Sequence, residues 1–142
     1  MFSPDRDQAR AFFVQAWRKR RAGVPEMPLE ALAADVIAAH PEYHALLESD
    51  DGGIDRKFSV EEGRPNPFLH LSLHLAIEEQ LQIDQPTGIV MAFQRLTNRH
   101  GFRHAALHAA LECLGETLWE AQRSGQAPDG ERYLERMNRA AG

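Results

Sequence analysis

The sequence lacks the features that mark secreted, membrane-spanning and nucleic-acid-binding proteins. Its single cysteine, Cys113, excludes an internal disulfide and suits a reducing compartment. No run of 18 apolar residues occurs and no apolar stretch opens the chain, so we expect neither a membrane span nor a signal peptide. The net charge of -5 gives no broad basic field, so nucleic acid and anionic membranes are not expected partners. We therefore predict a soluble, cytoplasmic protein.

Several common catalytic motifs are also missing. The sequence has no serine or cysteine nucleophile elbow, no glycine-rich phosphate loop and no Cys-x-x-Cys pair. On a helix, Cys113 projects away from the face that carries His108, so a Cys–His catalytic dyad is not expected. A small-molecule substrate, a protein partner and a homo-oligomer all stay open.

The pattern of apolar residues predicts an all-α fold. A chain of 142 residues with 43% hydrophobic composition can bury one core, so we predict a single domain over residues 1–142. Nothing alternates with period two for long enough to require a sheet. We expect a helical bundle of about five to six helices, interrupted by a long, acidic and glycine-rich loop at residues 49–65 that Phe58 pins to the body.

The central helix is predicted over residues 66–81. Asn66 is a favoured N-cap and Pro67 suits the first helical position. The polar side chains Ser72 and Glu79 share a narrow arc, whereas His70 and His74 fall on the opposite, apolar side. This helix should be the most buried element, with two imidazoles in the core that need partners.

Other helices are predicted on both sides of the central one. A first helix starts after a Ser3 cap and ends in the basic run at 18–21, which we interpret as a solvated last turn. A second spans about 29–40, a short turn follows at 43–47, and a fourth helix ends at Gly101. A fifth covers about 102–123, with Gly125 as its C-terminal stop, and a last short helix is capped by Asp129. The apolar face of the fifth helix is predicted to hold His104, Leu107, His108, Leu111, Gly115, Leu118 and Trp119, with Gly115 allowing a close helix approach.

Six of the seven histidines make three separate His-x-x-x-His pairs, and the seventh, His100, stands four residues before His104. Chance would give roughly 0.3 such pairs at this composition, so the spacing needs an explanation. Residues i and i+4 are neighbours on a helix, and two of the pairs continue to a glutamate at the next such position. Imidazole and carboxylate are ligands for borderline divalent metals. The candidate ligands are His40, His44, His70, His74, Glu78, His104, His108 and Glu112.

We interpret these residues as a metal site between the central and fifth helices, with zinc, iron or manganese as the ion. Glu78 and Glu112 lie at the edges of their faces, so each is either a ligand or a group that orients an imidazole. The pair His40 and His44 is weaker, because Pro41 separates its members. A metal-bound water with a glutamate base would make a hydrolase, and a metal or redox sensor is the other form of this hypothesis.

A second hypothesis needs no metal. Buried histidines also hydrogen-bond to carboxylates and carbonyls, and the protein would then be an interaction module that works through an exposed surface such as the acidic loop. Whether the protein is an enzyme stays open at this stage.

Four segments resemble a family of small uncharacterised bacterial proteins, a domain of unknown function. They are His40-Pro41-Glu42-Tyr43-His44, then Asn66-Pro67-Phe68-Leu69-His70 with His74, then His108 with Glu112-Cys113-Leu114, and Leu118-Trp119-Glu120-Ala121-Gln122. The resemblance covers nearly the whole chain and implies no reaction. The His/Glu triplets are also similar to those of haemerythrin-like and DinB-like bundles, which implies a metal inside a helical bundle.

Overall fold

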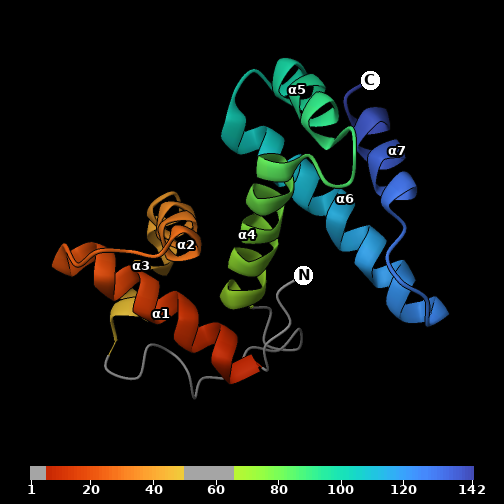
Figure 1. Cartoon of the computed structure of the whole chain (residues 1–142). Helices are drawn as coiled ribbons and strands as arrows, with labels where there is room; N and C mark the ends of the chain where they lie inside the picture. Colours follow the sequence, from red (N-terminus) through yellow and green to blue (C-terminus); the bar gives the residue numbers. More distant parts are fainter. Residues whose placement is uncertain (1–5, 50–65) are drawn as a thin grey trace. The chain divides into compact units, whose positions relative to one another are not determined.

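The protein is all-helical in the part of the chain that the structure describes. The computed structural model describes residues 6–49 and 66–142, and within these ranges it contains seven α-helices, one 3-10 helix and no strand (Figure 1). The predicted all-α class is therefore confirmed. The count exceeds the predicted five to six because His44–Glu48, expected as a turn, forms a short helix. The acidic loop with Phe58, and the Ser3 cap, lie outside the described residues.

Contacts divide the chain into two compact units, Met1–Leu75 and Ala76–Gly142, and the division falls within one helix. The single domain proposed from the sequence stays a prediction. No helix among the described residues is long and apolar enough to cross a membrane.

The first unit is built on a pair of helices, α1 and α2. It comprises α1 (Arg6–Ala22), α2 (Pro28–Ala38), the 3-10 helix η1 (Pro41–Tyr43), α3 (His44–Glu48) and the first part of α4 (Pro67–Ile83). α1 packs against both α2 and α3. The core contains Phe13, Val14, Ala16, Trp17, Ala33, Ala34, Val36, Ile37, Leu47, Phe68, Leu71 and Leu75.

The basic run lies in the last turn of α1, as predicted, with exposed or partly exposed side chains; Lys19 and Arg20 in addition pair with acidic residues on and just before α2. Lys19 donates to Glu30 at 2.9 Å, and Arg20 donates to Glu26 at 2.6 Å and to Asp35 at 3.0 Å. These bonds hold the pKa values of Glu26 and Glu30 below their usual range; for Glu30 the Met27 backbone N–H contributes most. Glu26 lies just before α2, whereas Glu30 and Asp35 lie on it, and their pairing with α1 depends on tertiary contact.

α4 begins as predicted. The Asn66 side-chain oxygen accepts hydrogen bonds from the backbone N–H groups of Phe68 and Leu69, at 3.0 and 3.2 Å. This cap satisfies two of the donors that a helix start leaves without intrahelical partners. It also sets the rotation of the first turns of α4, from which Phe68 and Leu71 enter the core while His70 and His74 project from another side.

The second unit contains a three-helix arrangement after the end of α4. It comprises α5 (Ile89–His100), α6 (Arg103–Ser124) and α7 (Gly130–Ala140), and each of the three packs against the other two (Figure 1). The helix ends agree closely with the sequence. Gly101 and Gly125 close α5 and α6 with φ of 85° and 68°, a left-handed conformation that favours glycine. Asp129 caps α7 by accepting from the Arg132 N–H at 3.2 Å.

The predicted apolar face of α6 was right for Leu107 but wrong for several other residues. Its buried residues are Ala106, Leu107, Ala110, Cys113, Leu114 and Thr117. His104 is exposed and Trp119 is 55% exposed. A side chain added at Gly115 would meet nothing within 4 Å, so no helix in the described part of the chain approaches there. Small residues on the buried face allow close packing against α5 and α7, and the Thr117 hydroxyl is satisfied by donating to the Cys113 carbonyl at 2.8 Å.

Candidate metal centre

The structure brings three of the predicted ligands together in the first unit. His40, His70 and His74 each offer a ring nitrogen, and these nitrogens lie within 4.8 Å of one another. His40 is 2% exposed and His74 is 1% exposed, while His70 is half-buried. We call these three residues the histidine group. Their side chains are close enough to hold one metal ion.

His70 and His74 form the helical half of the group. They lie one turn apart on α4, with ring centroids 4.7 Å apart and their Nε2 atoms separated by 3.1 Å. Two imidazoles on one tetrahedral ion, each at about 2.0–2.1 Å, would have nitrogens roughly 3.3–3.5 Å apart. The separation of this pair is thus nearly that of two ligands of the same ion. Without an ion, one Nε2 carries a proton and donates it to the other.

His40 reaches the group from a short non-helical link. α2 ends at Ala38, and His40 precedes η1 with φ of -126° and ψ of 68°. Its Nδ1 lies 2.7 Å from the Val36 carbonyl oxygen. Since a carbonyl can only accept, Nδ1 carries the proton and Nε2 has the lone pair. A metal-binding histidine commonly donates its other ring N–H to a carbonyl in this way.

The His40 ring meets both rings of α4. Its centroid lies 4.5 Å from that of His74 and 5.1 Å from that of His70, in edge-to-face arrangements. His40 was a weaker candidate ligand in the sequence, because Pro41 interrupts the helical spacing after it. At Pro41 the chain turns into η1, and this turn brings His40 to the group. Periodicity could not predict that turn.

Tyr43 is a neighbour of the histidine group that the sequence analysis did not select. Its ring stacks on His40 with centroids 5.8 Å apart and planes within 9°, and meets His70 edge-on at 6.0 Å. Burial raises the pKa of Tyr43, and the nearby Glu42 carboxylate raises it further. The Tyr43 hydroxyl therefore keeps its proton and carries no charge beside the histidine group. An aromatic residue three positions after His40 was visible in the sequence, but nothing there indicated which way it faced.

His44 lies apart from the histidine group. Its Nε2 donates to the Ile37 carbonyl at 2.8 Å, and its ring stacks on Trp17 with centroids 4.5 Å apart. His40 and His44 thus both bond to carbonyls at the end of α2, and the Ile37 carbonyl also accepts from the His40 backbone N–H at 2.9 Å. The structure gives His44 this capping role.

Glu78 makes an ion pair in the second unit. Both of its carboxylate oxygens accept hydrogen bonds from Arg103, at 2.8 and 2.9 Å. This bonding raises the pKa of Arg103. The bidentate pair gives Glu78 a structural partner that sequence spacing did not indicate, since Arg103 starts a different helix.

The other predicted ridge, His104 and His108, lies on α6 in the second unit. The two ring centroids are 4.4 Å apart, so the two imidazoles are neighbours along one side of the helix. Glu112, one turn further on, is exposed. The proposal that this ridge shares an ion with His70 and His74 stays a prediction.

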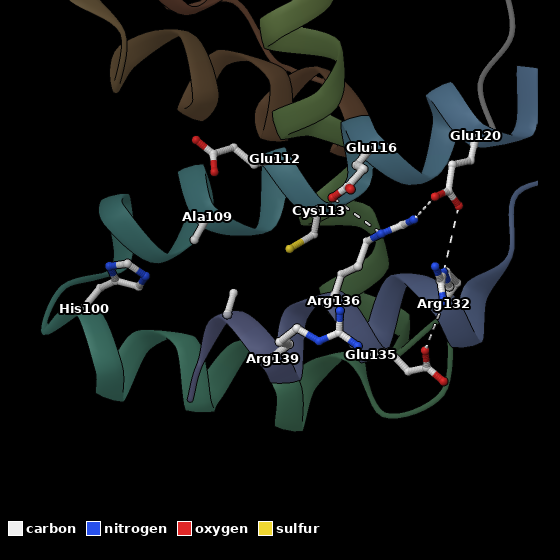
Figure 2. Close-up of a pocket in the computed structure, with 11 residues that line it drawn as sticks. His100, Ala109, Glu112, Cys113, Glu116, Glu120, Arg132, Glu135, Arg136 and Arg139 are labelled. Atoms are coloured by element: carbon white, nitrogen blue, oxygen red, sulfur yellow. Dashed lines mark ion pairs between the residues drawn. The ribbon is translucent and has the colours of Figure 1, made fainter. Parts of the chain in front are cut away.

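A separate hollow of about 470 Å³ lies between α6 and α7 (Figure 2). Arg136 crosses it to form ion pairs with Glu116, at 3.5 Å, and with Glu120. Glu112 lines the hollow, but its side chain points away from Arg136 (Figure 2). Burial raises the pKa of the Cys113 thiol, and the nearby glutamates add to this. The raised pKa favours the protonated thiol of Cys113.

Comparison with known proteins assigns a family and no activity. A family profile described as "Domain of unknown function (DUF1841)" matches residues 5–139. Neither the curated proteins nor the solved structures gave a match. The matched range contains the whole histidine group. Since it spans nearly all of the sequence, the chain belongs to this family of unknown function, as the resemblance of its segments predicted.

Proposed function

We propose that this chain is a metal-binding protein, with the ion held by the imidazoles of His40, His70 and His74. One observation carries the proposal: three ring nitrogens from two separate segments lie within 4.8 Å of one another in a largely buried place. Three mutually close imidazoles repel one another if they are protonated and are costly to bury as cations. A divalent ion gives all three nitrogens a common partner.

The donor set favours zinc or iron over manganese among the predicted metals. Imidazole suits zinc and iron, whereas manganese favours carboxylate and carbonyl oxygens, which the histidine group does not supply. The hydrogen bond from His40 Nδ1 to the Val36 carbonyl leaves Nε2 as the coordinating atom and holds the ring in place. Three protein ligands leave one position of a tetrahedral ion open, the arrangement typical of reactive rather than purely structural zinc sites.

We propose metal binding with one open coordination position, and we assign no reaction to the ion. A hydrolytic reaction was predicted to use a glutamate base, but Glu78 is held at both oxygens by Arg103. This bonding removes one of the two glutamates on which that reaction depended. An open position on the ion also suits a regulatory ligand, as a metal or redox sensor requires.

Packing without metal is the competing explanation, because an N–H···N bond between His70 and His74 already satisfies one nitrogen of each. Calorimetric titration of zinc into chelator-treated protein separates the two. We expect one zinc per chain for the wild type, loss of this binding in His74→Leu, and wild-type binding in His100→Ala, whose imidazole is exposed on α5. Equal zinc binding by the wild type and His74→Leu, or none by the wild type, would leave only packing.

A further inference from the structure

We propose that Tyr43 is the positioning residue of the metal site, because its ring sets the orientation of His40 for coordination. The inference rests on the proposed function. It concerns a residue outside the donor set, and it follows from how each of the three histidines is held.

The three imidazoles are not equally constrained by secondary structure. His70 and His74 sit on one helix at i and i+4, so regular backbone geometry already places their rings side by side. His40 lies between two helices, with backbone angles that belong to neither. It is therefore the ligand whose position depends most on neighbouring side chains.

Besides the rings of His70 and His74, two described contacts restrain the His40 ring. The bond from Nδ1 to the Val36 carbonyl fixes one edge of the ring but leaves the ring able to tilt about that bond. The Tyr43 ring lies against its face, with the planes within 9°. Tilting His40 would break this stack, so Tyr43 restrains the motion that the hydrogen bond leaves free.

Tyr43 is well placed to act as a rigid support. It closes η1, where its backbone N–H donates to the His40 carbonyl at 3.0 Å, and Pro41 restricts the backbone between them. Its ring also packs against the hydrophobic core of the first unit. The same ring also meets His70 edge-on. The Tyr43 ring thus contacts both His40, which lies in the link, and His70, which lies on α4.

Loss of this support should weaken metal binding without removing a ligand. Substituting residues that orient metal ligands typically costs about 10–100-fold in metal affinity. We expect a loss in this range for Tyr43→Leu, which removes the ring. Tyr43→Phe keeps the ring and its stack, so it should bind metal as the wild type does.

The experiment measures zinc affinity and the visible absorption of the cobalt(II)-loaded protein for the wild type, Tyr43→Phe and Tyr43→Leu. Cobalt absorption reports the arrangement of ligands around the ion, which a general loss of stability would leave unchanged. Phe12→Leu is the matched control, since Phe12 is a partly buried ring that packs on the same core and contacts Phe13. Circular dichroism verifies that each variant is folded.

The inference predicts weaker zinc binding and a changed cobalt spectrum for Tyr43→Leu only. It is overturned if Tyr43→Leu matches the wild type, if Tyr43→Phe is as impaired as Tyr43→Leu, or if Phe12→Leu loses as much affinity. The first result removes any role for the residue, the second transfers the role to the hydroxyl, and the third reduces it to core packing. Failure of the wild type itself to bind zinc or cobalt would instead overturn the proposed function, and this inference with it.

Discussion

Zinc should raise the melting temperature of the wild-type protein, and this shift should depend on the histidine group. A ligand that binds only the folded state adds RT ln(1 + [L]/Kd) to the free energy of unfolding, which is about 2.7 kcal/mol when free zinc is 100 times the dissociation constant. For a unit of 60–100 residues, each kcal/mol moves the melting temperature by about 4–8 °C. The expected rise is therefore about 11–22 °C, less any contribution from zinc bound to the unfolded chain.

The site's location explains why the first unit should respond. An ion at the histidine group would join the link before η1 to the first half of α4, two segments that are separate in the sequence. The unfolded chain cannot hold the three imidazoles together at this spacing without losing conformational entropy. Most of the binding free energy should thus appear as folding stability.

The assay is thermal unfolding followed by circular dichroism, with chelator and with added zinc. His74→Leu is the decisive variant, because His74 is 1% exposed and leucine suits an apolar setting. We expect this variant to fold and to lose the zinc-dependent shift. A shift of the same size in His74→Leu and in the wild type would refute the reasoning, as would a wild type that melts identically with chelator and with zinc.

Three further predictions concern the helices and the second ridge. Asn66→Ala removes the cap of α4 and should cost about 1 kcal/mol in the free energy of unfolding, measured by urea denaturation. Glu30→Gln should lower stability at neutral pH, because the lowered pKa of Glu30 contributes stability above its ordinary value of 4.5. That contribution is lost as pH falls through the folded-state pKa, so wild type and variant should converge in acid urea titrations. His108→Ala tests the sequence-based prediction of a shared site: the three-histidine site predicts unchanged zinc affinity in calorimetry, and a weaker affinity would make His108 a fourth ligand.

Local sequence features predicted the helices well, because caps and breakers act on their own neighbours. Asn66, Gly101, Gly125 and Asp129 bound their helices as expected. The i, i+4 spacing likewise placed His70 beside His74. These are interactions within a few residues, for which no knowledge of the tertiary fold is needed.

Predictions that depended on tertiary contact did less well. The buried face of α6 follows alanines, Cys113 and Thr117, because neighbouring helices pack closely on small side chains, whereas the periodicity argument gave weight to His104 and Trp119. Glu78 was grouped with His70 and His74 by spacing, yet it pairs with Arg103 from another helix. Hydropathy and spacing carry no information about such partners.

The candidate site was predicted in part for the same reason. The ridge on α4 follows from one helix, but His40 joins it only because the chain turns at Pro41 into η1. His44, in the same pair, takes a different partner at the end of α2. Which member of a His-x-x-x-His pair faces the site depends on the turn between two helices, and that turn was not predictable from spacing.

The most direct test of the central claim is X-ray absorption at the zinc edge of the loaded wild-type protein. Coordination by His40, His70 and His74 predicts three imidazole nitrogens at about 2.0–2.1 Å from the ion, with a further light ligand in the open position. The imidazole contribution should fall by one in a His40→Ala variant that still retains some zinc. A spectrum with mostly oxygen ligands, or one that His40→Ala leaves unchanged, would contradict the account.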